Sequence, residues 1–223
     1  MNLNPNHPAV IEGRTIHPKM VKLPDLRILK SAADNQKLGK GKHVIQKGKW
    51  KGLPMYSLTL QERETCPRSC LHWRDCYGNN MGFARRIEHR DPLFLPLLER
   101  EIRSLAKHYI HGFVIRLHVL GDFYSKDYVA FWDKMLCLIP ELHVFGYTAR
   151  KWKILRFMRT KFPERWWIRF SYPITYQGGS LYAGPAEREF DGIQCPEQTG
   201  KTESCLTCGL CWSIPASIKF MRH

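Results

Sequence analysis

The sequence lacks any long apolar run. No eighteen consecutive apolar residues occur in the 223-residue chain, which excludes an ordinary transmembrane helix. The first ten residues, MNLNPNHPAV, have no apolar core of the kind found in secretory signal peptides. We therefore expect a cytoplasmic protein with no membrane partner. In that reducing compartment, the eight cysteines are better candidates for metal binding or catalysis than for disulfides.

Acidic residues are also scarce. The chain has 20 Asp and Glu against 35 Lys and Arg, so its formal net charge is +15. Such an excess favours a polyanionic partner, DNA or RNA, although a merely solvated basic surface is the alternative. The basic residues are clustered in KLGKGKHVIQKGKWKG (37–52), which resembles a flexible arm or hairpin, in GFARRIEHR (82–90), and in the segment that follows residue 149. The candidate nucleic-acid contacts are Lys49, Arg85, Arg86, Arg150, Lys151, Trp152, Lys153 and Arg156, with Trp152 as a base-stacking residue.

The central part of the chain alternates strand-like and helix-like segments. We predict strands at 55–60, 112–120, 142–148 and 166–172. We predict helices that begin at Asp91-Pro92, after Ser125 and at about residue 151. This order predicts an α/β fold with parallel strands, either an open sheet or a partial β/α barrel. The expected organisation is a basic N-terminal arm or hairpin (1–54), a β/α core (55–175) and a loop-rich, metal-binding C-terminal tail (176–223).

Parallel α/β folds place their sites at the carboxyl ends of the strands. Polar residues collect at these ends in the sequence, and we expect them to face one cleft. They are the three cysteines of TCPRSCLHWRDCYG (65–78), His118, Asp122, Tyr147, Thr148, Arg150, Ser171 and Tyr172. For His118 a core position is the alternative, because it lies inside an apolar run, and Asp122 could simply stabilise a turn.

The first cysteine group has no fourth cysteine. Cys66, Cys70 and Cys76 have the spacing C-x3-C-x5-C, whereas a closed structural zinc site needs four ligands. Three ligands leave an open coordination position, which is what a catalytic metal centre keeps for substrate. The alternative is a structural zinc site that His72 completes.

The second cysteine group has four members. Its spacing, C-x9-C-x2-C-x2-C, is a strong metal signal, and either an iron-sulfur cluster or a zinc ion would suit four thiolates. Its residues are Cys195, Cys205, Cys208 and Cys211. The eighth cysteine, Cys137, lies in an apolar helix and is expected to be a small core residue.

These motifs carry two resemblances. A strand that ends in a three-cysteine loop, with Tyr77 beside the last cysteine, resembles the radical S-adenosylmethionine (SAM) superfamily. More specifically, TCPRSC, CYG, RLHVLGDFYS, VFGYT and CPEQTGKTESCLTCGLCW resemble the phage and plasmid "gene product 88" family, over roughly residues 55 to 212. A phage-encoded member would work in the host cytoplasm.

The superfamily resemblance implies a [4Fe-4S] cluster on Cys66, Cys70 and Cys76, with SAM on the open iron and a reductant as partner. Gly121 and Asp122 would contact the amino group of SAM, and either Tyr147 and Thr148 or Ser171 would contact its ribose. The tail would match an auxiliary cluster, so the chain would hold one or two clusters. The interval of five residues and the absence of a complete GGEP-like turn depart from the superfamily pattern.

Three functions follow as hypotheses. The first is an iron-sulfur, radical-SAM-like enzyme acting on a nucleic acid or nucleotide, with Asp122, His118 and Tyr147 as candidate catalytic residues. The second is a zinc-stabilised nucleic-acid-modifying enzyme, in which Asp122 acts as nucleophile or base and zinc occupies the C-terminal four-cysteine site. The third is a non-enzymatic nucleic-acid-binding or regulatory protein.

Overall fold

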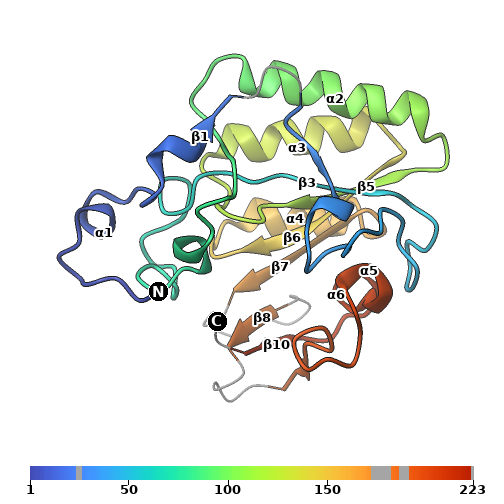
Figure 1. The fold of residues 1–223 in the computed structure, drawn as a ribbon. Helices are drawn as coiled ribbons and strands as arrows, with labels where there is room; N and C mark the ends of the chain where they lie inside the picture. The colour runs from blue at the N-terminus through green and yellow to red at the C-terminus, as the bar shows by residue number, and fades with distance from the viewer. Residues whose placement is uncertain (24–26, 172–181, 186–190, 222–223) are drawn as a thin grey trace.

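The computed structural model describes residues 1–23, 27–171, 182–185 and 191–221 (Figure 1). Tyr172 and much of the Gly- and Pro-rich segment before the second cysteine group lie outside the described residues. Within the described ranges, no helix is long and apolar enough to cross a bilayer. This finding agrees with the absence of a long apolar run from the sequence.

The protein is built on an open sheet of eight strands, in the spatial order β2-β3-β5-β6-β7-β8-β10-β9. All neighbouring strands are parallel except β2 and β3, which are antiparallel. The prediction of an α/β fold with a mainly parallel sheet is confirmed, and the sheet does not close into a barrel. The strands are β2 (Lys30–Ser31), β3 (Met55–Ser57), β5 (Phe113–Leu117), β6 (Leu142–Thr148), β7 (Trp166–Ser171), β8 (Tyr182–Pro185), β9 (Ile193–Gln194) and β10 (Ile218–Phe220).

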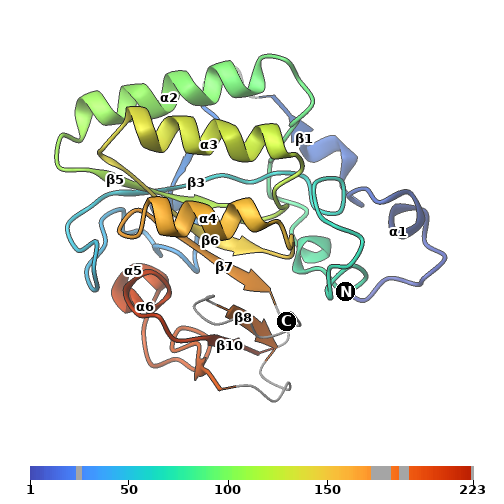
Figure 2. The same ribbon diagram turned by 180° about the vertical axis from the view of Figure 1, so that it is seen from behind.

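Three helices cover one face of the sheet: α2 (Phe94–His108), α3 (Lys126–Leu138) and α4 (Lys153–Lys161) (Figures 1 and 2). Side chains alternate along a strand, so every second residue faces these helices. On β5 these are Phe113, Ile115 and Leu117, which belong to one core cluster with Leu98 of α2 and Trp132 of α3.

Segments from both ends of the chain cover the other face. Val114, Phe145 and Trp167 point to this side from β5, β6 and β7. They pack with Leu38, Ile45 and Trp50 from the basic segment, and with Leu206 and Trp212 from the cysteine-rich tail. The basic segment is therefore partly a core element, because it covers the sheet together with the tail.

The remaining short elements lie around the sheet. The pair β1 (Val21–Lys22) and β4 (Arg86–Ile87) forms a separate two-stranded parallel sheet. The helical turns are α1 (Pro8–Glu12), η1 (Pro18–Met20), η2 (Ala32–Asp34), η3 (Tyr77–Asn80), α5 (Cys205–Cys208) and α6 (Leu210–Ser213).

Two local predictions were wrong. Helix α2 begins at Phe94 rather than at Asp91-Pro92, and the Asp91 carboxylate accepts a hydrogen bond from the backbone N–H of Leu93 in the turn that precedes the helix. Cys137 is exposed rather than part of the core, because it lies on the outer side of α3. The predicted cap of α3 is confirmed: the Ser125 hydroxyl accepts from the N–H of Tyr128 at 3.0 Å.

Candidate functional site

The loop with Cys66, Cys70 and Cys76 follows β3 and lies at the carboxyl edge of the sheet. In Figures 1 and 2 the arrowheads of β6 and β7 point to the side of the molecule where α1 and the N-terminus lie. There the N-terminal segment packs on the loop, since the indole N–H of Trp73 and the guanidinium of Arg68 both donate to the carbonyl of Val10.

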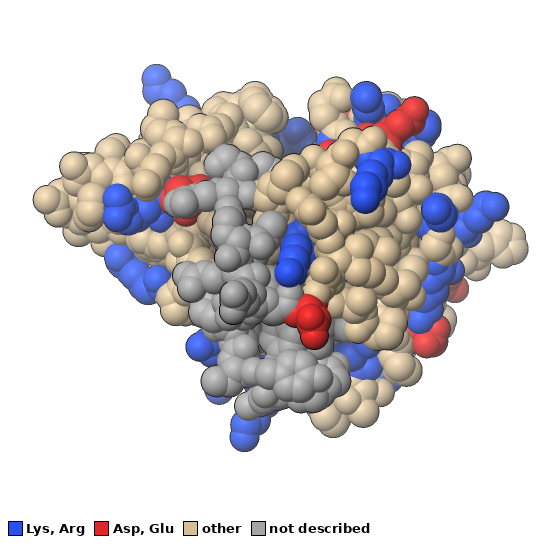
Figure 3. All heavy atoms as spheres, turned by 90° about the horizontal axis from the view of Figure 1, so that it is seen from below, with Lys and Arg blue, Asp and Glu red and all other residues tan. Residues whose placement is uncertain are grey.

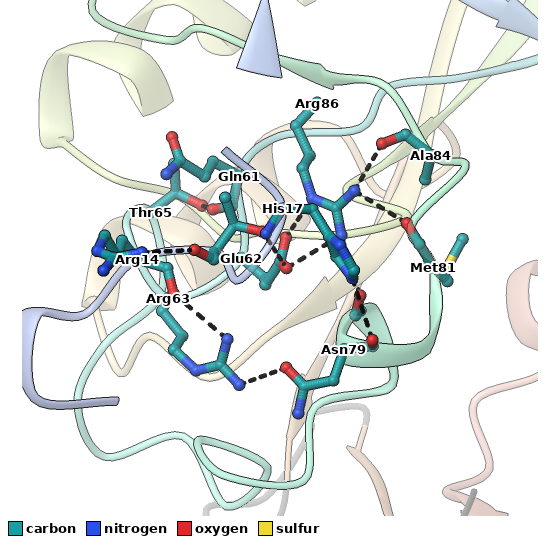
Figure 4. A network of polar contacts seen from close by, with 12 residues as sticks. Arg14, His17, Gln61, Glu62, Arg63, Thr65, Asn79, Met81, Ala84 and Arg86 are labelled. Atoms are coloured by element: carbon teal, nitrogen blue, oxygen red, sulfur yellow. Dashed lines mark hydrogen bonds and ion pairs between the residues drawn. The ribbon is translucent and has the colours of Figure 1, made fainter. Parts of the chain in front are cut away.

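A buried ion pair supports the base of this loop (Figure 4). Arg86 Nε lies 2.7 Å from Glu62 Oε2, Arg86 Nη2 lies 3.0 Å from Oε1, and the Thr15 hydroxyl donates to Oε1 at 2.6 Å. Burial alone would raise the pKa of Glu62, but the hydrogen bonds from Arg86 and Thr15 lower it below its ordinary value. Arg86 is fully buried. The prediction that it contacts nucleic acid is therefore wrong, because its guanidinium is already used inside the fold.

Arg63 and Asn79 tie the two ends of the loop together (Figure 4). Arg63 Nη2 donates to Asn79 Oδ1 at 2.5 Å, and Arg63 Nε donates to the carbonyl of Trp73 at 2.8 Å. The Asn79 amide donates to the carbonyl of Arg74 at 2.9 Å. The three-cysteine loop is therefore held by side chains of its own flanking residues.

Asp122 joins this loop to the ends of β5 and β6. Its carboxylate accepts hydrogen bonds from the N–H of Phe123 (2.7 Å), the hydroxyl of Thr148 (2.6 Å) and the N–H of Ala149 (2.8 Å). Its own N–H donates to the Thr65 hydroxyl at 3.0 Å. Burial raises the pKa of Asp122 to about 6, although these hydrogen bonds oppose the rise.

Gly121 allows this close approach. Its φ of +88° is in the left-handed region, and a Cβ at this position would lie 2.6 Å from Thr65 Oγ1 and 2.7 Å from Leu60 Cβ. Arg150 closes the same junction, since its guanidinium donates to the carbonyls of Phe123 (2.7 Å) and Thr65 (2.9 Å). The Gly121-Asp122 turn, which occupies the place of the GGEP-like turn of radical SAM enzymes in the predicted fold, thus lies beside the three-cysteine loop.

The three thiols are partly buried and influence one another electrostatically. Burial raises the pKa of Cys70 to about 11 and that of Cys76 to about 12, and it raises the pKa of Cys66 well above its usual value. Three thiols are donors that zinc and iron-sulfur clusters accept. Among the described residues, however, no three His, Cys, Asp or Glu side chains are arranged to hold a metal ion together. The donor chemistry fits such a group, whereas its binding would require the thiols to turn toward a common point.

The other predicted site residues do not share one cleft with the three cysteines. His118 lies in the core, where its Nε2 is 3.1 Å from the Tyr128 hydroxyl, and burial lowers its pKa to about 3. Tyr147 points to the tail, and its hydroxyl lies 3.1 Å from Cys211 Sγ. The Thr148 hydroxyl is bonded to Asp122, and Ser171 ends β7 beside β8. The catalytic and SAM-contacting roles of these residues remain predictions. His72 is exposed and pairs with Asp75 at 3.2 Å, so it does not complete the first cysteine group here.

The second cysteine group lies against the face of the sheet that the tail covers. Arg169 of β7 is fully buried and donates to the carbonyls of Cys211 (2.9 Å), Ile214 (2.9 Å) and Ala216 (2.5 Å). Trp212 stacks on Trp50 with ring centroids 6.2 Å apart. Gly209 has a φ of +70°, and a Cβ there would lie 2.2 Å from the carbonyl oxygen of Lys47. The tail and the basic segment are therefore in direct backbone contact.

The candidate nucleic-acid contacts differ in their exposure to solvent and in the contacts they already make within the protein. Lys49 pairs with Glu164 at 2.5 Å, and Arg85 donates to the carbonyl of Arg27. Lys151 and Lys153 are exposed at the start of α4, close to the loop that Arg150 contacts. Arg150 also lies over the ring of Trp152, which is partly buried, while Arg156 lies over Phe170. Figure 3 shows lysines and arginines scattered around one face rather than gathered in a single patch.

Sequence reasoning missed Glu62, Arg63, Asn79 and Arg169, which support the two cysteine groups, and Arg116, which lies near both. Charged residues are usually exposed, so a buried arginine in a strand has no distinctive local pattern. One signal was present: Arg116 and Arg169 each interrupt an apolar strand at an inward position of the alternation.

Comparisons with known proteins give a family but no activity. The model of the family described as Gene product 88 matches residues 27–191, well over half of the chain. No curated protein and no solved structure matches the chain. The resemblance to the radical SAM superfamily therefore gains no support from these comparisons. The match agrees with the motifs quoted from the sequence, and the chain belongs to the Gene product 88 family.

Proposed function

We propose that this protein is an iron-sulfur, radical-SAM-like enzyme that acts on a nucleic acid or nucleotide. The observation that carries the proposal is the position of the three-cysteine loop. It follows β3 at the carboxyl edge of a parallel sheet and adjoins the Gly121-Asp122 turn that follows β5. Parallel α/β proteins use this edge for their active sites.

Cys66, Cys70 and Cys76 would hold the catalytic cluster, and a reductant would be a partner. When bound, a cluster with SAM supplies a radical that can remove hydrogen from an unreactive C–H bond. The protein's own contribution is positional: Asp122, Thr65 and Arg150 fix the start of the loop against β5 and β6. Burial raises the pKa of Cys70 and Cys76, and the positive charge of Arg63 opposes part of this rise.

The four cysteines of the tail would hold an auxiliary metal group, an iron-sulfur cluster or zinc. Their support differs from that of the loop, since Tyr147 and Arg169 contact Cys211 from the sheet. The net charge of +15 and the exposed Lys151 and Lys153 near the loop favour a nucleic acid or nucleotide as substrate.

A second candidate is a zinc-stabilised enzyme in which Asp122 is the base. Its raised pKa, about 6, suits a general base near neutral pH. Its three accepted hydrogen bonds instead favour an anchoring role, because they use most of the carboxylate's accepting capacity. A non-enzymatic, nucleic-acid-binding role is the third possibility.

The deciding measurement is the iron, sulfide and zinc content of protein purified without oxygen, together with its visible spectrum. We expect iron-sulfur absorbance in the wild type. If both cysteine groups hold clusters, Cys76→Ala should lose about half the iron. Cys137→Ala is the matched control, because Cys137 is exposed on the outer side of α3 and should leave the metal content unchanged.

Zinc without iron would overturn the radical-SAM-like proposal. In that case Asp122→Asn separates the two remaining possibilities. Loss of turnover on a nucleic-acid substrate, with binding retained, would indicate the zinc enzyme. Binding without any turnover in the wild type would indicate the non-enzymatic protein.

A further inference from the structure

Arg116 is a partly buried arginine on a central strand of the sheet. It lies on β5, opposite Ser57 of β3 and Phe145 of β6. It alternates with Ile115 and Leu117, so it points to the face covered by the tail. Its side chain is partly buried, and its Nε is fully buried without a hydrogen-bond partner.

Arg169 provides the contrast on the same face. Its three guanidinium nitrogens all donate to tail carbonyls. Arg116, in comparison, makes no ion pair with any carboxylate in the part of the chain that the structure describes. A guanidinium with a buried, unsatisfied N–H is costly unless a counter-charge or acceptor reaches it. The two arginines therefore differ: all the guanidinium nitrogens of Arg169 bind the tail, whereas Arg116 Nε has no hydrogen-bond partner.

Arg116 lies near both cysteine groups. Its guanidinium carbon is 5.9 Å from the ring centre of Tyr147, whose hydroxyl contacts Cys211. Its positive charge also acts on Tyr77, the residue that follows Cys76. The positive charge thus acts on residues of both cysteine groups.

We propose that Arg116 binds a phosphate of the nucleotide or nucleic-acid substrate between the three-cysteine loop and the tail. The planar fork of N–H donors in a guanidinium matches the oxygens of a phosphate, which accepts two parallel hydrogen bonds. The ring of Tyr147 lies beside this position. The proposal rests on the proposed function, because it names the substrate group that the same site recognises. The phosphate could belong to a free nucleotide or to a nucleic-acid backbone.

The competing explanation is that Arg116 balances the charge of the cysteine thiolates. The positive charge of Arg116 acts on Cys205 and opposes the rise in its pKa that burial causes. The two explanations make different predictions, because a counter-ion for thiolates affects metal retention, whereas a phosphate anchor affects ligand affinity at unchanged metal content.

The test measures binding of three probes to the protein as purified without oxygen: inorganic phosphate, adenosine monophosphate and a single-stranded oligonucleotide. For Arg116→Gln we expect about a ten- to hundredfold weaker affinity for the probes that use the site, with unchanged metal content. Arg116→Lys should lose less, because it keeps the charge. Arg100→Gln, on the exposed side of α2, is the matched control and should bind as the wild type does.

The three probes separate the sources of phosphate. An effect on adenosine monophosphate and inorganic phosphate indicates a free nucleotide, whereas an effect on the oligonucleotide alone indicates a backbone phosphate. Equal affinities in wild type and Arg116→Gln overturn the proposal, as does loss of metal with unchanged affinity. Metal content, measured on the same samples, tests the proposed function separately: phosphate binding through Arg116 in a zinc-only protein would keep this inference and reject the iron-sulfur enzyme.

A measurement on the wild type covers the case in which Arg116→Gln does not fold. Phenylglyoxal modifies accessible arginines, and mass spectrometry reports the extent at each residue. We expect saturating adenosine monophosphate or oligonucleotide to protect Arg116 and not Arg100. Equal modification of Arg116 with and without all three probes would overturn the proposal.

Discussion

The two cysteine groups use the same donor atom but are supported in different ways. The three-cysteine loop lies at the edge of the sheet and is fixed by charged and polar side chains, chiefly Glu62 with Arg86 and Arg63 with Asn79. The four-cysteine tail lies flat on one face of the sheet and is held by aromatic packing and by Arg169. The loop is thus held partly by neighbours in the sequence, such as Asn79, and partly by the distant Thr15 and Asp122. The tail is held by Trp50 and Arg169, which both come from other parts of the chain.

The N-terminal region divides between these two groups. Residues 1–15 pack on the loop, as the contact between Thr15 and Glu62 shows. Residues 37–50 pack on the tail, where the N–H of Gln46 donates to the carbonyl of Leu206. Disturbing one support should therefore affect one cysteine group more than the other.

The largest effect is expected from Glu62→Gln. This change leaves the Arg86 guanidinium buried without its counter-charge, and breaking a buried pair in this way costs about 3–5 kcal/mol. The free energy of unfolding, measured with urea, reports the loss. Glu64→Gln is the control: Glu64 pairs with Arg90 at the surface, so its replacement should cost less than about 1 kcal/mol. Equal losses in the two variants would contradict the role given to the buried pair.

The same ion pair predicts a pH dependence. The pKa of Glu62 is lower in the folded protein than in the unfolded chain, so its ionisation stabilises the fold above the ordinary glutamate pKa. This contribution is lost as the pH falls through the lower, folded-state pKa. Between these two pKa values the unfolding free energy of the wild type should fall more steeply with acidification than that of Glu62→Gln. Parallel curves would show that Glu62 does not titrate as described.

A smaller effect, centred on the tail, is expected from Arg169→Gln. Loss of its guanidinium leaves carbonyls of Cys211, Ile214 and Ala216 without their donor, at a cost of about 3 kcal/mol. Hydrogen exchange read by mass spectrometry should show faster exchange in residues 205–213 and little change in residues 62–79. Arg165→Gln is the comparison, because Arg165 also donates to three carbonyls, but in the connection between α3 and β6. Faster exchange of the tail in both variants would contradict a specific role for Arg169.

The smallest effect is expected from Gly121→Ala, about 2 kcal/mol, because the new methyl group would press on Thr65 and Leu60. Gly52→Ala separates this contact from backbone strain, since Gly52 has a similar φ of +93° and nothing within 4 Å of a Cβ. We expect thermal unfolding to show a larger loss for Gly121→Ala than for Gly52→Ala. Similar losses would attribute the whole effect to the left-handed backbone.

The sequence predicted those parts of the fold whose signals are local. The bounds of β6 are as predicted, and α3 begins directly after its predicted cap, because alternation and capping are read within a few residues. The cover on the second face was not predicted, since Leu38, Ile45 and Trp50 are scattered among lysines and form no period.

The site was predicted less well than the fold. The prediction placed the three cysteines near Asp122, and the structure brings Asp122 to Thr65 at the start of their loop. For His118 the sequence left the edge of the sheet and the core as alternatives, and the structure places its imidazole in the core beside Tyr128. Arg86 was assigned to the surface, because nothing in the sequence shows that Glu62 lies opposite it.

The contact between the basic segment and the tail also constrains how the chain is made. Residues 37–50 leave the ribosome long before residues 205–213. In the folded protein, the apolar side chains of these two segments bury one another. Until synthesis is nearly finished, the tail is not there to cover Leu38 and Trp50, so the nascent chain exposes apolar surface that favours aggregation. A premature stop before residue 205 would therefore remove most of the second cysteine group and also leave the opposite end of the protein prone to aggregation and degradation.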